Sequence, residues 1–291
     1  MAERAFLVCA TPRSGSTLVC QALWQTGVAG RPQEYFEALR HSGRPRRPEE
    51  YFLGLDDPSI LDQLGARSRD EDPLPRSWLW NRSAYDRYLE WAIDTGTTPN
   101  GVFSAKLMWG YFDDFMALLR SVPRYRDLPL ADILPAAFGD DLTYVRVVRA
   151  NKIRQAVSLW KAIQTANWRQ DDGATLGRED CAAPCFNYRA IAHLLQQIVV
   201  EEASWDAYFE HCRVRPALVL YENFAADPHT STLDILERLG LEAPSDVRVD
   251  ARMKRQSDGI NDEWVQRFSE LRLGDESELA PAAPRALSLL L

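Results

Sequence analysis

The stretch Ala5-Phe6-Leu7-Val8-Cys9-Ala10, followed directly by Thr11-Pro12-Arg13-Ser14-Gly15-Ser16-Thr17, decides the fold of this chain. A continuous apolar run of this length is typical of a strand that is buried on both faces of a parallel sheet. The stretch Ser16–Gln25 then has the character of a helix that stops before Gly27. A strand, a tight turn and a helix in this order predict the first unit of an α/β fold.

The turn Thr11–Thr17 has the chemistry of a site for phosphate or sulfate. A strand, turn and helix in succession aim backbone N–H groups and a helix N-terminus at one point, which favours an anion. Gly15 permits close approach of the backbone, and Arg13 adds a positive charge with forked donors. Three hydroxyl groups follow, on Ser14, Ser16 and Thr17. An ordinary capped helix start also favours serine and threonine, but it needs neither the arginine nor three hydroxyls.

This turn is not a Walker A loop. That pattern needs two glycines and a lysine, whereas the turn has one glycine and an arginine. No acidic strand end is obvious as a partner for Mg²⁺ either. We therefore expect an anionic ligand that is held without metal. Two alternatives stay open, a small-molecule kinase or other nucleotide phosphotransferase, and a non-catalytic anion-binding module.

The rest of the chain alternates between strand-like and helix-like stretches. Strands are predicted at Ala5–Ala10, Gly101–Met108, Leu142–Val148 and Pro216–Tyr221. Helices are predicted at Ser16–Gln25, Ser83–Thr95, Asn151–Asn167, Asn187–His211 and Asp227–Leu239. Three polar segments read as loops, Arg40–Pro48, Arg169–Pro184 and Met253–Glu263. The alternation predicts a central parallel sheet with helices on both faces, in a single domain over residues 1–291.

Composition excludes several classes of protein. The 291 residues include 34 Lys+Arg and 42 Asp+Glu, and a net charge of -8 gives no support for a generic nucleic-acid surface. A hydrophobic fraction of 46% argues against disorder. We expect no membrane span and no targeting segment, because the first apolar run is short and no stretch approaches the ~20 apolar residues of a span. Five cysteines without a paired spacing read as plain thiols, so we expect a cytoplasmic location.

Several segments in the same order resemble the trehalose 2-sulfotransferase family. They cover most of the chain: Leu7–Leu18, Thr26–Phe36, Thr98–Phe103, Lys106–Trp109, Gln155–Thr165 and Asp262–Val265. The resemblance implies a P-loop-like sulfotransferase fold and a homodimer. It also implies 3'-phosphoadenosine 5'-phosphosulfate (PAPS) as the sulfuryl donor. The acceptor would be a hydroxyl of a carbohydrate or glycolipid-like molecule.

The resemblance also assigns catalytic roles. Sulfuryl transfer resembles phosphoryl transfer, in which positioning and electrostatics do most of the work. Arg13 occupies the place where other sulfotransferases carry a loop lysine, and it would stabilise charge on the leaving group. Glu34 matches the family's proposed general base within Pro32–Phe36. A solvated surface charge is the alternative for Glu34, and Glu37 is its nearest rival as the base.

A second anion site is needed for the 3'-phosphate of the donor. Arg149 follows the strand Leu142–Val148, and Ser158 lies in the next helix, which matches the usual sulfotransferase order of Arg then Ser. The serine follows the arginine by nine positions, one more than in many sulfotransferases. Arg149 could therefore be displaced, with Arg154 sharing its role. Lys254 and Arg255 could close over the nucleotide. With the loop residues Arg13, Ser14, Gly15, Ser16 and Thr17, Arg149 and Ser158 complete the expected donor site.

The acceptor site implied by the resemblance is formed by the segment after the first helix and by the next loop. Its expected lining residues are Arg31, Gln33, Tyr35, Phe36, Pro45, Tyr51 and Phe52. Three residues depart from the trehalose enzymes, Pro12 in place of Gln, Arg31 in place of an acid and Tyr51 in place of Trp. Lost or reversed hydrogen bonds to sugar hydroxyls can cost orders of magnitude in discrimination. The sequence therefore argues against trehalose itself as the preferred acceptor.

Overall fold

A computed structural model describes residues 3–37, 47–64, 84–168, 183–245, 247–249 and 259–274. Four parallel strands form one sheet in the order β2-β1-β3-β4. They are β1 (Arg4–Ala10), β2 (Val102–Met108), β3 (Leu142–Val148) and β4 (Ala217–Leu220). All four predicted strands are present, so the predicted central parallel sheet is confirmed.

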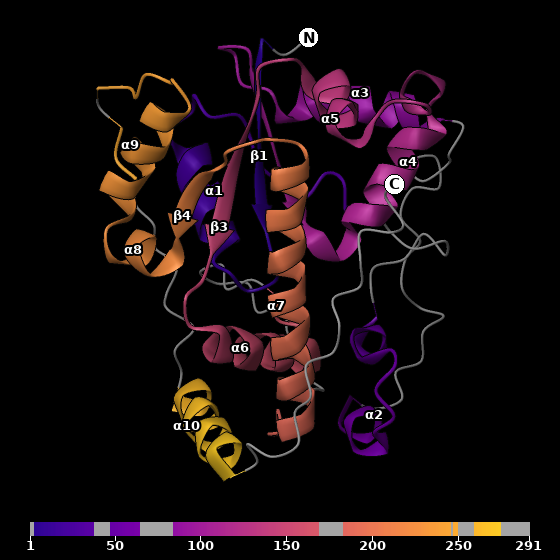
Figure 1. Cartoon of the computed structure of the whole chain (residues 1–291). Helices are drawn as coiled ribbons and strands as arrows, with labels where there is room; N and C mark the ends of the chain where they lie inside the picture. Colours follow the sequence, from indigo (N-terminus) through magenta and orange to yellow (C-terminus); the bar gives the residue numbers. More distant parts are fainter. Residues whose placement is uncertain are drawn as a thin grey trace.

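The helices that surround the sheet are shown in Figure 1. They are α1 (Ser16–Gln25), α2 (Pro58–Leu64), α3 (Tyr85–Gly96), α4 (Phe112–Ser121), α5 (Leu130–Phe138), α6 (Lys152–Thr165), α7 (Tyr188–His211), α8 (Tyr221–Ala226), α9 (Pro228–Arg238) and α10 (Gly259–Gly274). Short 3-10 helices lie at η1 (Pro48–Phe52), η4 (Trp109–Tyr111) and η5 (Pro123–Tyr125). The five predicted helices correspond to α1, α3, α6, α7 and α9. Four helices, α2, α4, α5 and α8, were not predicted. A helix was expected after Glu263, and α10 corresponds to it, although it begins earlier.

One predicted loop is partly wrong. The segment Met253–Glu263 was expected to be a loop, but α10 begins within it at Gly259. The helix forms because Trp264 and Phe268 lie four residues apart, so both rings reach the same face and are buried. Asp262, in the first turn of α10, pairs with Arg154 of α6 at 2.5 Å. The other two predicted loops lie mostly outside the described residues.

Both faces of the sheet are covered, as predicted. The side chains of β1 alternate between two hydrophobic cores, and residues 5–10 are at most 3% exposed. Ala5, Leu7 and Cys9 pack in the core that α3, α4, α5 and α7 cover. Phe6, Val8 and Ala10 face the core beneath α1, α8 and α9. This burial on both faces explains why β1 is a continuous apolar run.

A third core lies beyond the carboxyl ends of the strands. It joins η1, α2, α6, the first half of α7 and α10, with Trp160, Ile191 and Trp264 among its buried side chains. In Figure 1, α6 crosses below the lower end of β3, and α10 lies beyond it. Helices at this end of the sheet place their side chains near the turns that follow β1 and β3, where ligands of open α/β sheets bind.

The segment that follows α1 runs alongside β2 and extends the edge of the sheet. The N–H of Lys106 donates to the carbonyl of Gln33 at 2.9 Å, and Gln33 pairs with Ala105 in parallel. Gly30 has φ +65 and lies so close to β2 that a Cβ atom would be 2.7 Å from the backbone nitrogen of Ser104. This close approach brings the next residues, including Glu34, to the carboxyl end of β2.

Within the described ranges, no helix combines the length and the apolar character that a membrane crossing requires.

Candidate active site

The turn between β1 and α1 leaves its donors without a side-chain cap. Arg13 and Gly15 have φ +62 and +92, in the left-handed region. Gly15 is the N-cap of α1 and provides no side-chain hydrogen bond to the helix. The hydroxyl oxygen of Ser14 is buried and meets no hydrogen-bond partner among the residues that the structure describes. An ordinary capped helix start would satisfy these donors, so the geometry favours the anion site predicted from the sequence.

The Arg13 guanidinium is held by contacts to α6 and to the backbone of Trp168. Its Nε donates to the hydroxyl of Ser158 at 3.0 Å, and its Nη1 donates to the carbonyl of Trp168 at 2.7 Å. The pKa of Arg13 is lowered to about 10, mainly by burial and in addition by the charge of Arg149. A cation that is disfavoured by burial and by a second cation is suited to receive an anion.

Arg149, at the end of β3, lies beside Arg13. Its Nη1 donates to the carbonyl of Arg13 at 3.2 Å, and its guanidinium lies 4.8 Å from the centre of the Tyr221 ring. The Nε of Arg149 is buried, and none of the described residues accepts a hydrogen bond from it. Burial lowers the pKa of Arg149. The structure thus brings together Arg13, Arg149 and Ser158, because β1 and β3 are neighbouring parallel strands.

The nine-residue spacing between Arg149 and Ser158 places the serine on Arg13. Ser158 accepts the hydrogen bond of Arg13, while Arg149 holds the backbone of the same residue. Arg154, the expected substitute for Arg149, is paired with Asp262. Lys254 and Arg255 lie outside the described residues.

Glu34 is connected to the turn through a lysine. Its Oε1 lies 2.6 Å from the Nζ of Lys106, which also donates to the hydroxyl of Thr17 at 3.2 Å. The Tyr111 hydroxyl approaches the other Glu34 oxygen at 3.5 Å. The side chain of Lys106 is 4% exposed and that of Glu34 is 25% exposed. The carboxylate is therefore fixed next to the turn Thr11–Thr17, which we call the phosphate turn, and it is still partly open to solvent.

Sequence reasoning gave Lys106 no role, although a signal was present. It is the one charged residue in the predicted strand Gly101–Met108. A lysine in a strand that is buried on both faces needs a partner, because an unpaired buried charge is costly. The two oxygen atoms of Glu34 and Thr17 meet that need.

Some of the expected acceptor residues are exposed and others are buried. Arg31 and Gln33 are exposed along the edge beside β2. Tyr35 is buried, and its hydroxyl donates to the carbonyl of Arg31 at 2.8 Å. Phe36 is 1% exposed and stacks on Phe115 with ring centres 4.9 Å apart. In this structure Phe36 belongs to the core, and its contact with an acceptor stays a prediction.

The remaining acceptor residues come from η1. Tyr51 stacks on the ring of Trp168 at 6.1 Å, and the carbonyl of Trp168 binds Arg13. This places Tyr51 two contacts away from the phosphate turn. Phe52 is 4% exposed and packs edge-on against Trp160. Pro45 lies outside the described residues.

Three further residues support the site and were missed from the sequence. Gln155 donates to the hydroxyl of Thr11 at 2.9 Å and to the carbonyl of Pro12 at 2.7 Å. Tyr221 and Glu222 lie where β4 passes into α8, beside Gly15 and the turn after β3. Their position at the end of a predicted parallel strand, Tyr221 as its last residue and Glu222 directly after it, was the available signal, because the carboxyl ends of such strands meet at one edge.

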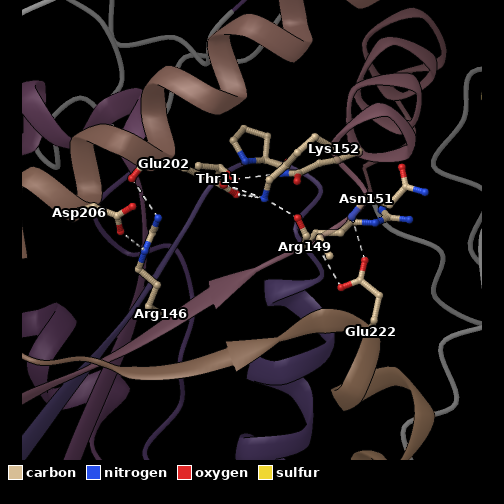
Figure 2. Close-up of polar contacts among 11 residues, drawn as sticks. Thr11, Arg146, Arg149, Asn151, Lys152, Glu202, Asp206 and Glu222 are labelled. Carbon is tan, nitrogen blue, oxygen red and sulfur yellow. Dashed lines mark hydrogen bonds and ion pairs between the residues drawn. The ribbon is translucent and has the colours of Figure 1, made fainter. Parts of the chain in front are cut away.

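Figure 2 shows how polar contacts fix the turn that follows β3. The Glu222 carboxylate accepts from the N–H groups of Ala150 and Asn151 at 3.0 and 3.2 Å. Burial acts to raise the pKa of Glu222, but these N–H donors and Arg149 outweigh it and lower the pKa. Lys152 donates to the carbonyl of Arg149 and pairs with Glu202 of α7 at 2.6 Å. The turn after β3, which carries Arg149, is therefore anchored to α7 and α8.

Comparison with known proteins identifies relatives along nearly the whole chain. A family model described as Stf0 sulphotransferase matches residues 5–270. The chain is 32% identical over 270 residues to the trehalose 2-sulfotransferase of Mycolicibacterium smegmatis, covering 91% of this chain and 94% of that protein. It is 31% identical over 270 residues to the trehalose 2-sulfotransferase of Mycobacterium tuberculosis, covering 92% and 95%.

Similar solved structures include a sulfotransferase from Alicyclobacillus acidocaldarius, with a TM-score of 0.46 and 16% identity, covering 96% of this chain and 98% of that one. Another is the sulfotransferase STF9 from Mycobacterium avium, with a TM-score of 0.42 and 14% identity, covering 96% of this chain and 70% of that one.

Proposed function

This chain belongs to the Stf0 sulphotransferase family, and on this premise we propose that it transfers the sulfuryl group of PAPS to a hydroxyl of a carbohydrate or glycolipid-like acceptor. The observation that carries this proposal is the convergence of Arg13, Arg149 and Ser158 on the turn at the end of β1. That arrangement supplies two cations for one polyanionic ligand. Such an arrangement fits an enzyme with the P-loop-like sulfotransferase fold.

The residues present fit PAPS, and two unsatisfied donors support that fit. Within the described ranges of the chain, the Ser14 hydroxyl and the Arg149 Nε are buried without hydrogen-bond partners, and buried polar groups in native proteins are nearly always satisfied. The N–H groups and hydroxyls of Ser14–Thr17, with Arg13, would hold the phosphosulfate end. Arg149 and Ser158 would hold the 3'-phosphate. When bound, PAPS supplies an activated sulfuryl group.

Glu34 is the proposed general base. Its carboxylate would take the proton of the acceptor hydroxyl as the acceptor oxygen bonds to sulfur and the bond from sulfur to the bridging oxygen breaks. Arg13 would stabilise the negative charge that develops on that bridging oxygen. A guanidinium does not donate its proton, so the role of Arg13 is electrostatic. Lys106, between Glu34 and Thr17, supports this assignment because it holds the base beside the turn.

The acceptor of this chain differs from trehalose in our proposal, although the named relatives are trehalose 2-sulfotransferases. Pro12, Arg31 and Tyr51 are the departures that motivate it. Arg31 is exposed at the edge of the sheet, where a basic group favours other hydroxyl patterns than an acidic one does. A panel of sugars and glycosides assayed with labelled PAPS tests this proposal. Trehalose leading that panel would contradict it.

The family resemblance supports two further proposals. One is a single sulfotransferase domain over residues 1–291, and the other is a homodimer. Light scattering of the purified protein tests the second proposal, and a monomeric mass would contradict it.

Thermal unfolding with added nucleotides tests the donor assignment. A ligand at 100 times its Kd stabilises a protein by about 2.7 kcal/mol. We expect adenosine 3',5'-bisphosphate, the product nucleotide, to raise the Tm. A shift with ATP and Mg²⁺ but none with adenosine 3',5'-bisphosphate would contradict the sulfotransferase proposal and favour a kinase.

A further inference from the structure

We propose that Glu222 is a positioning residue for the donor nucleotide, which holds Arg149 at a fixed distance from the phosphate turn and so sets the preference for a 3'-phosphate. This inference rests on the proposed function. It concerns a residue that lies outside the turn between β1 and α1 and outside the Arg149–Ser158 pair.

The first argument is the contact of Glu222 with the backbone after β3. Its two carboxylate oxygens accept from consecutive N–H groups, those of Ala150 and Asn151. These are the two residues that directly follow Arg149. Hydrogen bonds to a charged acceptor are stronger than bonds between neutral groups. The carboxylate therefore fixes the backbone that carries the arginine, as Figure 2 shows.

The second argument is the position of the neighbouring Tyr221. Its ring lies against Gly15, where a Cβ atom would be 2.1 Å from the Tyr221 Cδ2 atom. The same ring has the guanidinium of Arg149 above it at 4.8 Å. Tyr221 is thus in contact with both anion subsites, the glycine of the turn and the arginine of the 3'-phosphate site. Two adjacent residues at one strand end span the two halves of the site.

The third argument is a buried donor of Arg149. Its Nη1 donates to the carbonyl of Arg13, while its Nε is buried and meets no hydrogen-bond partner among the described residues. The direction of the Nε donor depends on the backbone that Glu222 holds and on the ring of Tyr221. A small displacement of the turn after β3 would misdirect the donor, because hydrogen bonds weaken steeply with angle. Loss of Glu222 is therefore expected to act on the 3'-phosphate more than on the rest of the nucleotide.

The alternative is that Glu222 is only a structural helix cap. Asp227, a few residues later, is such a cap, since its carboxylate accepts from the N–H of Thr230 at the start of α9. Asp227→Ala is thus a matched control. It removes a capping carboxylate from the same region of the chain, at the start of α9, a helix that packs against α1 and α8.

The experiment measures the Kd of two nucleotides by calorimetry. Adenosine 3',5'-bisphosphate carries the 3'-phosphate, and adenosine 5'-monophosphate differs from it only by lacking that phosphate. For Glu222→Ala we expect affinity for the bisphosphate to fall about 10-fold to 100-fold, the scale of lost charged hydrogen bonds, and affinity for the monophosphate to change by less than about 3-fold. Glu222→Gln keeps one oxygen acceptor and should fall in between, and it serves if the alanine variant does not fold. Asp227→Ala should leave the ratio of the two affinities unchanged.

Each other outcome has a definite meaning. If both affinities fall equally, or neither changes, Glu222 is a structural cap and the inference is wrong, while the proposed function stands. If the wild-type protein binds both nucleotides equally well, the 3'-phosphate assignment of the proposed function fails as well.

Discussion

Replacement of Arg13 by alanine should remove catalysis while leaving the free protein folded. The guanidinium donates to Ser158 and to Trp168, and a hydrogen bond of this kind is worth about 1 kcal/mol. Against this, burial and the charge of Arg149 lower the pKa of Arg13 to about 10. A lowering of this size corresponds to an unfavourable contribution on the order of 3 kcal/mol for the charged form. The two effects oppose each other, so Arg13→Ala should unfold at a Tm close to or above that of the wild type.

The effect on function should be large. Removal of one donor from a site that stabilises developing charge lowers kcat by about 100-fold to 1000-fold. Nucleotide binding should weaken as well, because one of the two cations of the site is gone. Arg13→Lys should keep part of both activities, since the charge remains while the forked donor geometry is lost.

Two measurements on the same preparation decide this prediction. Steady-state assays give kcat, and thermal unfolding with and without adenosine 3',5'-bisphosphate gives the free stability and the ligand-induced shift. Wild-type kcat in Arg13→Ala would refute the leaving-group role. A large fall in the Tm of the free variant would refute the argument that the arginine is held at a cost in stability.

Three further predictions, two of them with a control substitution, test the rest of the site. Glu34→Gln should lower kcat by about 100-fold to 10,000-fold with little change in nucleotide affinity, whereas Glu37→Gln should not; the reverse pattern would make Glu37 the base. Lys106→Met should lower kcat by about 10-fold to 100-fold, because it releases the base from its ion pair, and an unchanged kcat would show that the base needs no such support. Gly15→Ala should abolish nucleotide binding, because the added Cβ atom would overlap the Tyr221 ring. Gly27 has a similar φ, but a Cβ atom there would meet none of the described atoms within 4 Å. Gly27→Ala should therefore cost only about 1–2 kcal/mol of stability.

The fold could be predicted to a large extent from local patterns. Each strand of the sheet is an apolar or β-branched run, and α1 and α7 have clear boundaries, so hydrophobic periodicity was sufficient. The helices α4 and α5 were missed although apolar residues recur at helical spacing between β2 and β3 and Pro123, Pro129 and Gly139 mark helix ends there. The start of α10 was missed because it depends on the burial of Trp264 and Phe268 against distant helices.

The site was predictable where its residues follow one another in the chain. The turn Thr11–Thr17 and Arg149 stand directly after strands, and a sequence shows this. The pairs that connect them join residues far apart, such as Lys106 with Glu34 and Glu222 with Asn151. Such contacts depend on the order and register of the strands, which a single sequence does not determine. Pairs of this kind are visible only once the sheet is assembled.

The central claim is that this chain transfers a sulfuryl group from PAPS to a hydroxyl, and the most direct test follows labelled sulfur from PAPS into an added carbohydrate. We predict a labelled sulfate ester with the wild-type protein, and a rate for Glu34→Gln that is lower by about 100-fold or more at saturating donor. Absence of labelled product with every hydroxyl acceptor of a broad sugar and glycoside panel, from protein that binds adenosine 3',5'-bisphosphate, would contradict the claim.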